Sequence, residues 1–359
     1  MRDEKKYIKI YESLRDDILK GIYPYMSKLP SKRVTADTFG ASLITVEHAY
    51  ELLMEEDYIR PKERSGYFVS YEEGKILHAS PAAKERFVKR ERAEEGDSYR
   101  FPISVFAGTV RRILSEYAEE VLVKSPSQGC LVLREAIRDY LLRNRHIDVK
   151  TDQIIIGSGS EYLYGLIVQT FGRAVIYGIE NPSYEKIAMI YRAAGVECDF
   201  LTLLSDGIRS SDLEKTEAKV LHITPYRSYP SGISATAAKK REYIRWAERK
   251  GGIIIEDDFE SEFSPSRKME ETLFTIDKGK NVIYVNTFSK TVSSSLRVAY
   301  MVLPEWLTHL FEEKIGFYSC TVPTLDQYIL AELIQNGDFE RHINKVRRLK
   351  RAEGEGWQT

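Results

Sequence analysis

The apolar positions at the start of the chain have the spacing of three helices. Apolar side chains recur every three or four residues over 7–18, which predicts an amphipathic helix that ends before Gly21. The serine that opens the segment 31–39 is a good N-cap, so a short helix is expected there. A second serine cap predicts another helix over 43–55, and Gly40 suits the left-handed turn between the two.

Two short segments of strand-forming residues follow these helices. Residues 58–60 and 66–69 are expected to form strands, joined by a basic tip over 61–65. Three helices and a hairpin in this order predict a winged helix-turn-helix, a mostly helical module with a β-hairpin wing, over residues 1–70.

Three motifs in this region resemble those of the GntR family of DNA-binding domains. They are LPSKR, SLITVEHAYELL and RSGYFV, and the resemblance covers about residues 5–70. It implies double-stranded DNA as a partner, with the second helix of the motif in the major groove and the wing on phosphates. The implied contact residues are Lys32, Arg33, Ser42, Thr45, His48 and Arg64.

The charge of this module departs from what such a role favours. The first 70 residues hold 12 basic and 12 acidic side chains. Family members commonly carry Arg where this chain has Leu43, and Pro-Gly where it has Tyr25-Met26. Because fewer basic contacts weaken attraction to phosphates, we expect weaker DNA binding than is usual, or binding through two modules of a dimer. The alternative is a helical module used for protein contact.

A change of composition separates this module from the rest of the chain. Residues 71–98 are charged and have little apolar periodicity, which predicts an exposed tether. The tether either carries a signal between domains or is a passive spacer, and the spacer is the default interpretation.

From residue 99 to residue 359, apolar strand-like segments alternate with amphipathic helical ones. This pattern predicts an α/β domain with a largely parallel sheet, whose ligand sites lie at the carboxyl ends of the strands. The expected strands cover 153–156, 174–177, 220–223, 252–255 and 282–285, and a helix is expected over 239–249.

Residues with suitable chemistry follow several of these strands. Lys290 comes shortly after one strand. A lysine held at the end of a buried strand can lose its proton more easily than one in water, and the neutral amine can form a Schiff base. Asp257 ends another strand, where a buried carboxylate could keep a pyridine nitrogen protonated. The Gly/Ser turn over 157–160 precedes a helix, which suits an anion. Each feature alone has an ordinary structural explanation: a solvated lysine, a helix cap or a simple turn.

Taken together and in order, these features resemble a fold-type I aminotransferase domain, and in particular the MocR/GabR subfamily of regulators. The segments that carry the resemblance are SQGCLVLREAIRDYL, EDDFESEF and NVIYVNTFSKTVSSSLRVAYMVLP, within about 101–348. The resemblance implies pyridoxal 5'-phosphate as cofactor, with Lys290 as the Schiff-base lysine and Asp257 beside the pyridine nitrogen. It also implies a phosphate site at Ser158, Gly159, Ser160, Ser289 and Arg297, with Tyr184 over the ring.

Three departures from the subfamily pattern bear on activity. Phe259 stands where a tyrosine usually donates a hydrogen bond to the cofactor, and Arg227 stands where the pattern has His in a Thr-Pro-x-His-Gln stretch. The chain also ends at Thr359, before the small C-terminal subdomain that carries an arginine for the substrate carboxylate. We therefore expect a truncated domain with an open pocket and negligible turnover.

Composition excludes several other classes of protein. With 43% hydrophobic and 30% charged residues the chain is typical of soluble globular proteins, and its apolar runs are too short to cross a membrane. Three distant cysteines fit neither a disulfide framework nor a zinc site, and they suit the cytoplasm. A net charge of −1 requires that any nucleic-acid binding come from a local surface.

The leading hypothesis is a transcription regulator, acting as a head-to-tail homodimer, that senses an amino-compound effector by Schiff-base exchange. One alternative is a working aminotransferase with an attached DNA module. Another is a decayed DNA-binding remnant that no longer binds the cofactor.

Overall fold

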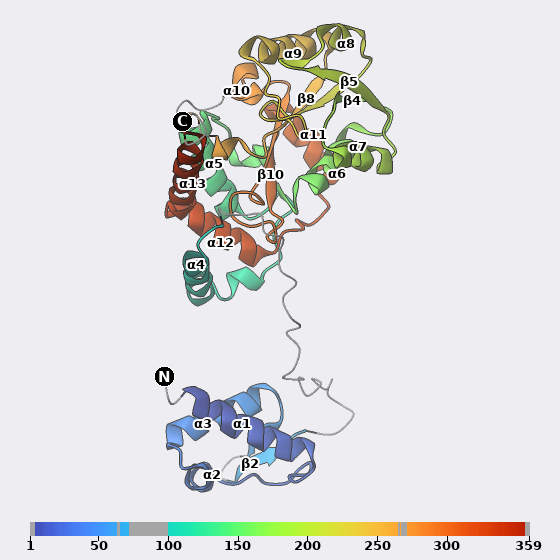
Figure 1. The fold of residues 1–359 in the computed structure, drawn as a ribbon. Coiled ribbons are helices and arrows are strands. Elements are labelled where there is room, and N and C mark those ends of the chain that lie inside the picture. Colours follow the sequence, from blue (N-terminus) through green and yellow to red (C-terminus); the bar gives the residue numbers. More distant parts are fainter. Residues whose placement is uncertain (1–3, 63–64, 72–99, 265, 267–270, 356–359) are drawn as a thin grey trace. The chain divides into compact units, whose positions relative to one another are not determined.

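The computed structural model describes residues 4–62, 65–71, 100–264, 266 and 271–355. The chain divides into two compact units between residues 95 and 96. Figure 1 labels many of the helices and strands of both units.

The first unit contains three helices and a two-stranded antiparallel hairpin, as the sequence predicts. Ser31 Oγ accepts a hydrogen bond from the Val34 amide at the start of the second helix, and Gly40 ends that helix with φ of 54°. Both local predictions are confirmed. The elements are α1 (Glu4–Leu19), α2 (Lys32–Phe39), α3 (Leu43–Glu55), β1 (Ile59–Lys62) and β2 (Gly66–Val69).

The second unit is built on an eight-stranded sheet with the order β3-β10-β9-β8-β7-β4-β5-β6. Strands β9, β8, β7, β4 and β5 run parallel, while β10 is antiparallel to both of its neighbours and β6 is antiparallel to β5. The strands are β3 (Ile154–Gly157), β4 (Tyr177–Asn181), β5 (Cys198–Leu204), β6 (Gly207–Ile208), β7 (Val220–Ile223), β8 (Ile253–Asp257), β9 (Val282–Thr287) and β10 (Ala299–Val302). The prediction of a mainly parallel sheet is confirmed.

Helices cover both faces of this sheet. Ile254 packs into a core cluster with residues of α4, α5, α9, α10, α12 and α13, whereas its neighbour Ile255 packs into a second cluster with α6, α7 and α11. Because successive strand residues point to opposite faces, this division shows a three-layer domain. The helices are α4 (Ile103–Glu116), α5 (Leu131–Arg145), α6 (Ser160–Phe171), α7 (Glu185–Ala193), α8 (Ser210–Lys215), α9 (Ala237–Lys250), α10 (Leu273–Asp277), α11 (Glu305–Ile315), α12 (Thr324–Gln335) and α13 (Asp338–Glu355).

One expectation about local structure was wrong. The strand expected over 174–177 begins only at Tyr177, because Gly172 ends α6 with φ of 85° and a turn follows it. The last helix, α13, continues to Glu355. The predicted tether over 71–98 lies outside the described residues, apart from Tyr71. None of the described helices is long and apolar enough to span a membrane.

Candidate ligand pocket and DNA-binding surface

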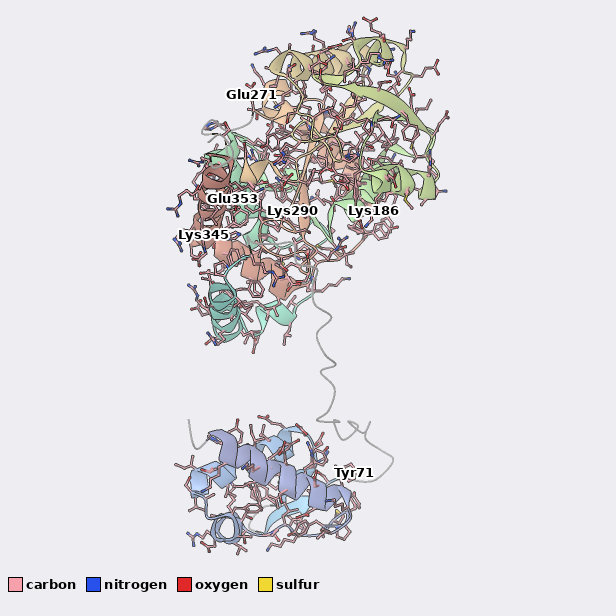
Figure 2. All side chains as sticks on the ribbon, in the orientation of Figure 1. Tyr71, Lys186, Glu271, Lys290, Lys345 and Glu353 are labelled. Atoms are coloured by element: carbon pink, nitrogen blue, oxygen red, sulfur yellow. The ribbon has the colours of Figure 1, made fainter. Side chains whose placement is uncertain are left out.

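A cavity of about 480 Å³ opens at the carboxyl ends of the central strands. Seven of the eight residues predicted to hold a cofactor line it: Gly159, Ser160, Tyr184, Asp257, Ser289, Lys290 and Arg297. Lys290 and a second lining lysine, Lys186, can be located in Figure 2. Ser158 is not among the lining residues, since its hydroxyl accepts a hydrogen bond from Thr321 Oγ1 at 2.9 Å.

The fold brings these residues together by ending several strands at one edge of the sheet. Asp257 is the last residue of β8, and Ser289 and Lys290 follow the end of β9. Gly159 precedes α6 with φ of 91°, and a Cβ atom there would lie 2.9 Å from the Arg297 guanidinium. The positive φ therefore favours glycine at this position, and any side chain there would also displace the Arg297 guanidinium.

Asp257 is the most strongly positioned residue of the pocket. It is 7% exposed, and its Oδ2 accepts a hydrogen bond of 2.6 Å from the hydroxyl of Tyr164. Burial and the neighbouring carboxylate raise the pKa of Tyr164 well above its usual value, so the phenol remains a donor. Oδ1 of Asp257 is buried and has no hydrogen-bond partner among the described residues. A buried carboxylate oxygen left in this state is suited to a donor from a ligand.

A buried histidine extends this arrangement behind the pocket. His222 Nε2 lies 3.7 Å from Asp257 Oδ2, and its Nδ1 is 2.6 Å from the hydroxyl of Tyr191. Neither Tyr164 nor His222 was predicted from the sequence. His222 interrupts the apolar strand Val220–Ile223, and a polar residue within such a strand is the signal that could have identified it.

The exposure of Lys290 differs from expectation. The strand that precedes it is buried, as expected, but the Lys290 side chain is exposed among the residues that line the cavity. The residues around it include both basic and acidic side chains. Arg297 forms an ion pair of 3.0 Å with Glu161, and Lys186 lies 3.6 Å from the same carboxylate. Tyr184 is 42% exposed and meets the ring of Tyr229 edge-on.

The three consecutive acids at the end of β8 have three different environments. Glu256 accepts hydrogen bonds from the amides of Leu273 and Phe274 at the start of α10, and burial raises its pKa to about 7. Asp258 forms a buried ion pair with Arg145. Only Asp257, between them, lines the pocket.

The two substituted positions of the aminotransferase pattern lie in different places. Phe259 lines the cavity, as expected. Arg227 is exposed and is not among the residues that line the cavity. It has φ of 50°, and its amide donates a hydrogen bond to Ser234 Oγ.

The predicted DNA contacts are not equally available in the first unit. Arg33 and His48 are exposed, whereas Lys32 is paired with Glu47 at 2.6 Å. Ser42 caps α3. Thr45 is only 6% exposed and its hydroxyl is 2.7 Å from Ser42 Oγ, so its burial argues against the predicted contact with DNA. Arg64 lies outside the described residues.

Comparison with known proteins agrees with both parts of this description. Residues 6–69 match the family described as "Bacterial regulatory proteins, gntR family", and residues 110–353 match "Aminotransferase class I and II". The HTH-type transcriptional regulator YdeL of Bacillus subtilis is 31% identical over 97% of this chain and 77% of its own length. The probable rhizopine catabolism regulatory protein MocR of Rhizobium meliloti is 25% identical over 97% of this chain and 75% of its own length.

Solved aminotransferases share the fold of the second unit. The kynurenine aminotransferase of Pyrococcus horikoshii aligns with a TM-score of 0.63 at 24% identity, over 69% of this chain and 64% of that protein. The α-aminoadipate aminotransferase LysN of Thermus thermophilus aligns with a TM-score of 0.62 at 28% identity, over 71% of this chain and 66% of that protein. This chain therefore belongs to the HTH-type transcriptional regulators in which a GntR-type DNA-binding module precedes an aminotransferase class I and II domain.

Proposed function

We propose that the pocket binds pyridoxal 5'-phosphate on Lys290 and that the domain senses an amino compound, whose binding alters the affinity of the GntR-type module for DNA. The observation that carries the proposal is the unpaired Oδ1 of Asp257, a buried acceptor on the wall of a cavity that also contains a lysine amine. LysN, which shares the fold, was solved with a phosphopyridoxyl derivative of leucine, and this supports the same class of cofactor.

The lining residues fit the cofactor in charge and in position. Asp257 would accept a hydrogen bond from the ring nitrogen, and Tyr164 would hold the carboxylate in place from behind. Ser160 begins a helix of 12 residues, whose amides suit a phosphate, and Arg297 and Ser289 would complete that site. Tyr184 would cover the ring at the mouth of the pocket. When bound, the cofactor supplies an aldehyde that can exchange the lysine amine for the amine of a ligand.

A regulator needs only this exchange and a change in its DNA module. We propose a head-to-tail homodimer, which would present two such modules to DNA. Several large apolar side chains on the second unit are exposed, which supports an interface there. They are Ile103 at 78%, Leu122 at 86%, Val123 at 64% and Leu131 at 51%.

Because a DNA-binding regulator acts where the chromosome is, the location that we propose is the cytoplasm.

The first experiment is to mix the purified protein with pyridoxal phosphate, reduce it with borohydride and map the modified residue by mass spectrometry. We expect a phosphopyridoxyl group on Lys290. Lys186 offers a matched control, because it lines the same cavity and its side chain is 58% exposed. The Lys290→Arg variant should lose the adduct, and the Lys186→Arg variant should keep it. An adduct on Lys186 alone, or none on folded protein, would contradict the proposal.

A second experiment tests the sensing role. Amino compounds are added to the loaded protein while its affinity for DNA is followed by fluorescence anisotropy. A change in affinity that disappears in Lys290→Arg supports the regulator. Steady conversion of an amine donor to its keto acid, with unchanged DNA binding, would instead indicate an aminotransferase with an attached DNA module. DNA binding without any adduct would indicate a remnant that no longer uses the cofactor.

A further inference from the structure

The solvent-facing side of α3 begins with two aliphatic side chains. Leu43 is 49% exposed and Ile44 is 68% exposed, although they open a helix whose opposite face is fully buried through Val46, Ala49 and Tyr50. Within the described part of the first unit, the apolar core does not include either side chain. Two adjacent exposed aliphatic groups at one helix end indicate contact with an apolar group of a partner.

Polar groups in the same turn are already engaged. Ser42 Oγ accepts a hydrogen bond from the Thr45 amide and lies 2.7 Å from the Thr45 hydroxyl. One turn further along, the Glu47 carboxylate is paired with Lys32 at 2.6 Å. Among the side chains at the beginning of α3, Leu43 and Ile44 therefore present hydrocarbon, while Ser42, Thr45 and Glu47 are engaged with neighbours.

The partner of this helix is DNA, because α3 lies within the GntR-type module at residues 6–69. In the major groove every base edge carries hydrogen-bond donors or acceptors, and the one apolar group there is the C5-methyl of thymine. We infer that Leu43 and Ile44 contact thymine methyl groups and so select A·T pairs at the positions that they face. The inference rests on the DNA-binding role of the module and is independent of the cofactor.

The test compares thymine with uracil in a site chosen by the full-length protein. Duplexes with a randomised centre are selected by binding, and the enriched site is synthesised with deoxyuridine replacing each thymidine in turn. This change removes the methyl group and leaves the base pairing intact. Synthetic duplexes contain no 5-methylcytosine, so thymine is the one source of the methyl group. We expect one or two replacements to weaken binding, by about fourfold for each methyl group that becomes buried.

Variants assign the effect to the two side chains. Leu43→Ala combined with Ile44→Ala should bind the thymine and uracil duplexes equally. Ile22→Ala is the matched control, since Ile22 is an exposed aliphatic residue of the same unit, at 61%, and should retain the discrimination. Alanine favours helix at positions 43 and 44, and Ile22 is an exposed residue outside the helices, so both variants should fold, which thermal unfolding checks.

Three results would overturn the inference: selection without enrichment, equal affinity of the natural protein for both duplexes, or discrimination that persists in the double variant. Failure to bind any DNA would be a different result. It would contradict the DNA-binding role itself and leave the exposed face of α3 as a protein contact.

Discussion

A buried ion cluster beside the pocket gives the sharpest prediction about stability. Arg145, the last residue of α5, is placed with its guanidinium 3.2 Å from Asp258 and 3.3 Å from Glu262, and the three side chains are 2%, 6% and 3% exposed. Replacing Arg145 with Met would leave two carboxylates without a cation in a site from which water is excluded. Breaking a buried pair in this way costs about 3–5 kcal/mol of unfolding free energy.

The pH dependence of this loss has a definite sign. Burial raises the pKa of Glu262 in the folded protein. Without the arginine this pKa should rise further, so the folded variant binds a proton that the unfolded chain releases. Its stability then falls as the pH rises from the unfolded pKa towards the folded one. The deficit of Arg145→Met relative to the natural protein should therefore be larger at pH 8 than at pH 6.

Urea unfolding followed by tryptophan fluorescence measures the effect. The three tryptophans, Trp246, Trp306 and Trp357, all follow residue 96, so the signal reports on the second unit. Arg138→Met is the matched control, because Arg138 lies on the same helix with its side chain 40% exposed, and it should change the free energy by less than about 0.5 kcal/mol. Adding Asp258→Asn and Glu262→Gln to Arg145→Met should recover part of the loss. A loss below about 1 kcal/mol for Arg145→Met, equal at both pH values, would refute the reasoning.

Three further predictions concern the pocket and a buried carboxyl group outside its lining, Glu180. Burial raises the pKa of Glu180 to about 8, so the natural protein should lose stability as the pH rises from about 4.3 to 8, by at most about 1.4 kcal/mol per pH unit. Glu180→Gln should reduce this slope in thermal unfolding measured across that range, and an unchanged slope would show that another group causes it. Glu161→Gln releases Arg297 from its exposed ion pair and should tighten pyridoxal phosphate binding about two- to fivefold in an absorbance titration. Weaker binding would contradict the idea that Glu161 and the phosphate compete for the Arg297 guanidinium. Tyr164→Phe removes the hydrogen-bond donor to the Asp257 carboxylate and should lower the unfolding free energy, measured by urea unfolding without ligand, by about 1.5–3 kcal/mol. An unchanged free energy would mean that the carboxylate finds another donor.

Much of the architecture follows from local sequence signals. The caps at Ser31 and Ser42 and the turn at Gly40 each depend on atoms within a few residues, and all three occur as predicted. The central strands were identified because short apolar runs bounded by turn residues are typical of buried strands. The antiparallel strand β10 was not identified, because its place between β3 and β9 depends on pairing with distant segments.

The residues of the pocket could be nominated from sequence, but their environments could not. Nothing local distinguishes Asp257 from its two acidic neighbours, and the distinction arises from a tyrosine that is 93 residues away in the chain. The same limit explains why the exposure of Lys290 and the burial of Thr45 were not anticipated. Sequence alone determined which elements form and which residues follow each strand, because those depend on neighbouring residues. Burial, pairing and free hydrogen-bonding capacity depend on which distant segments pack together, so only the tertiary structure decided them.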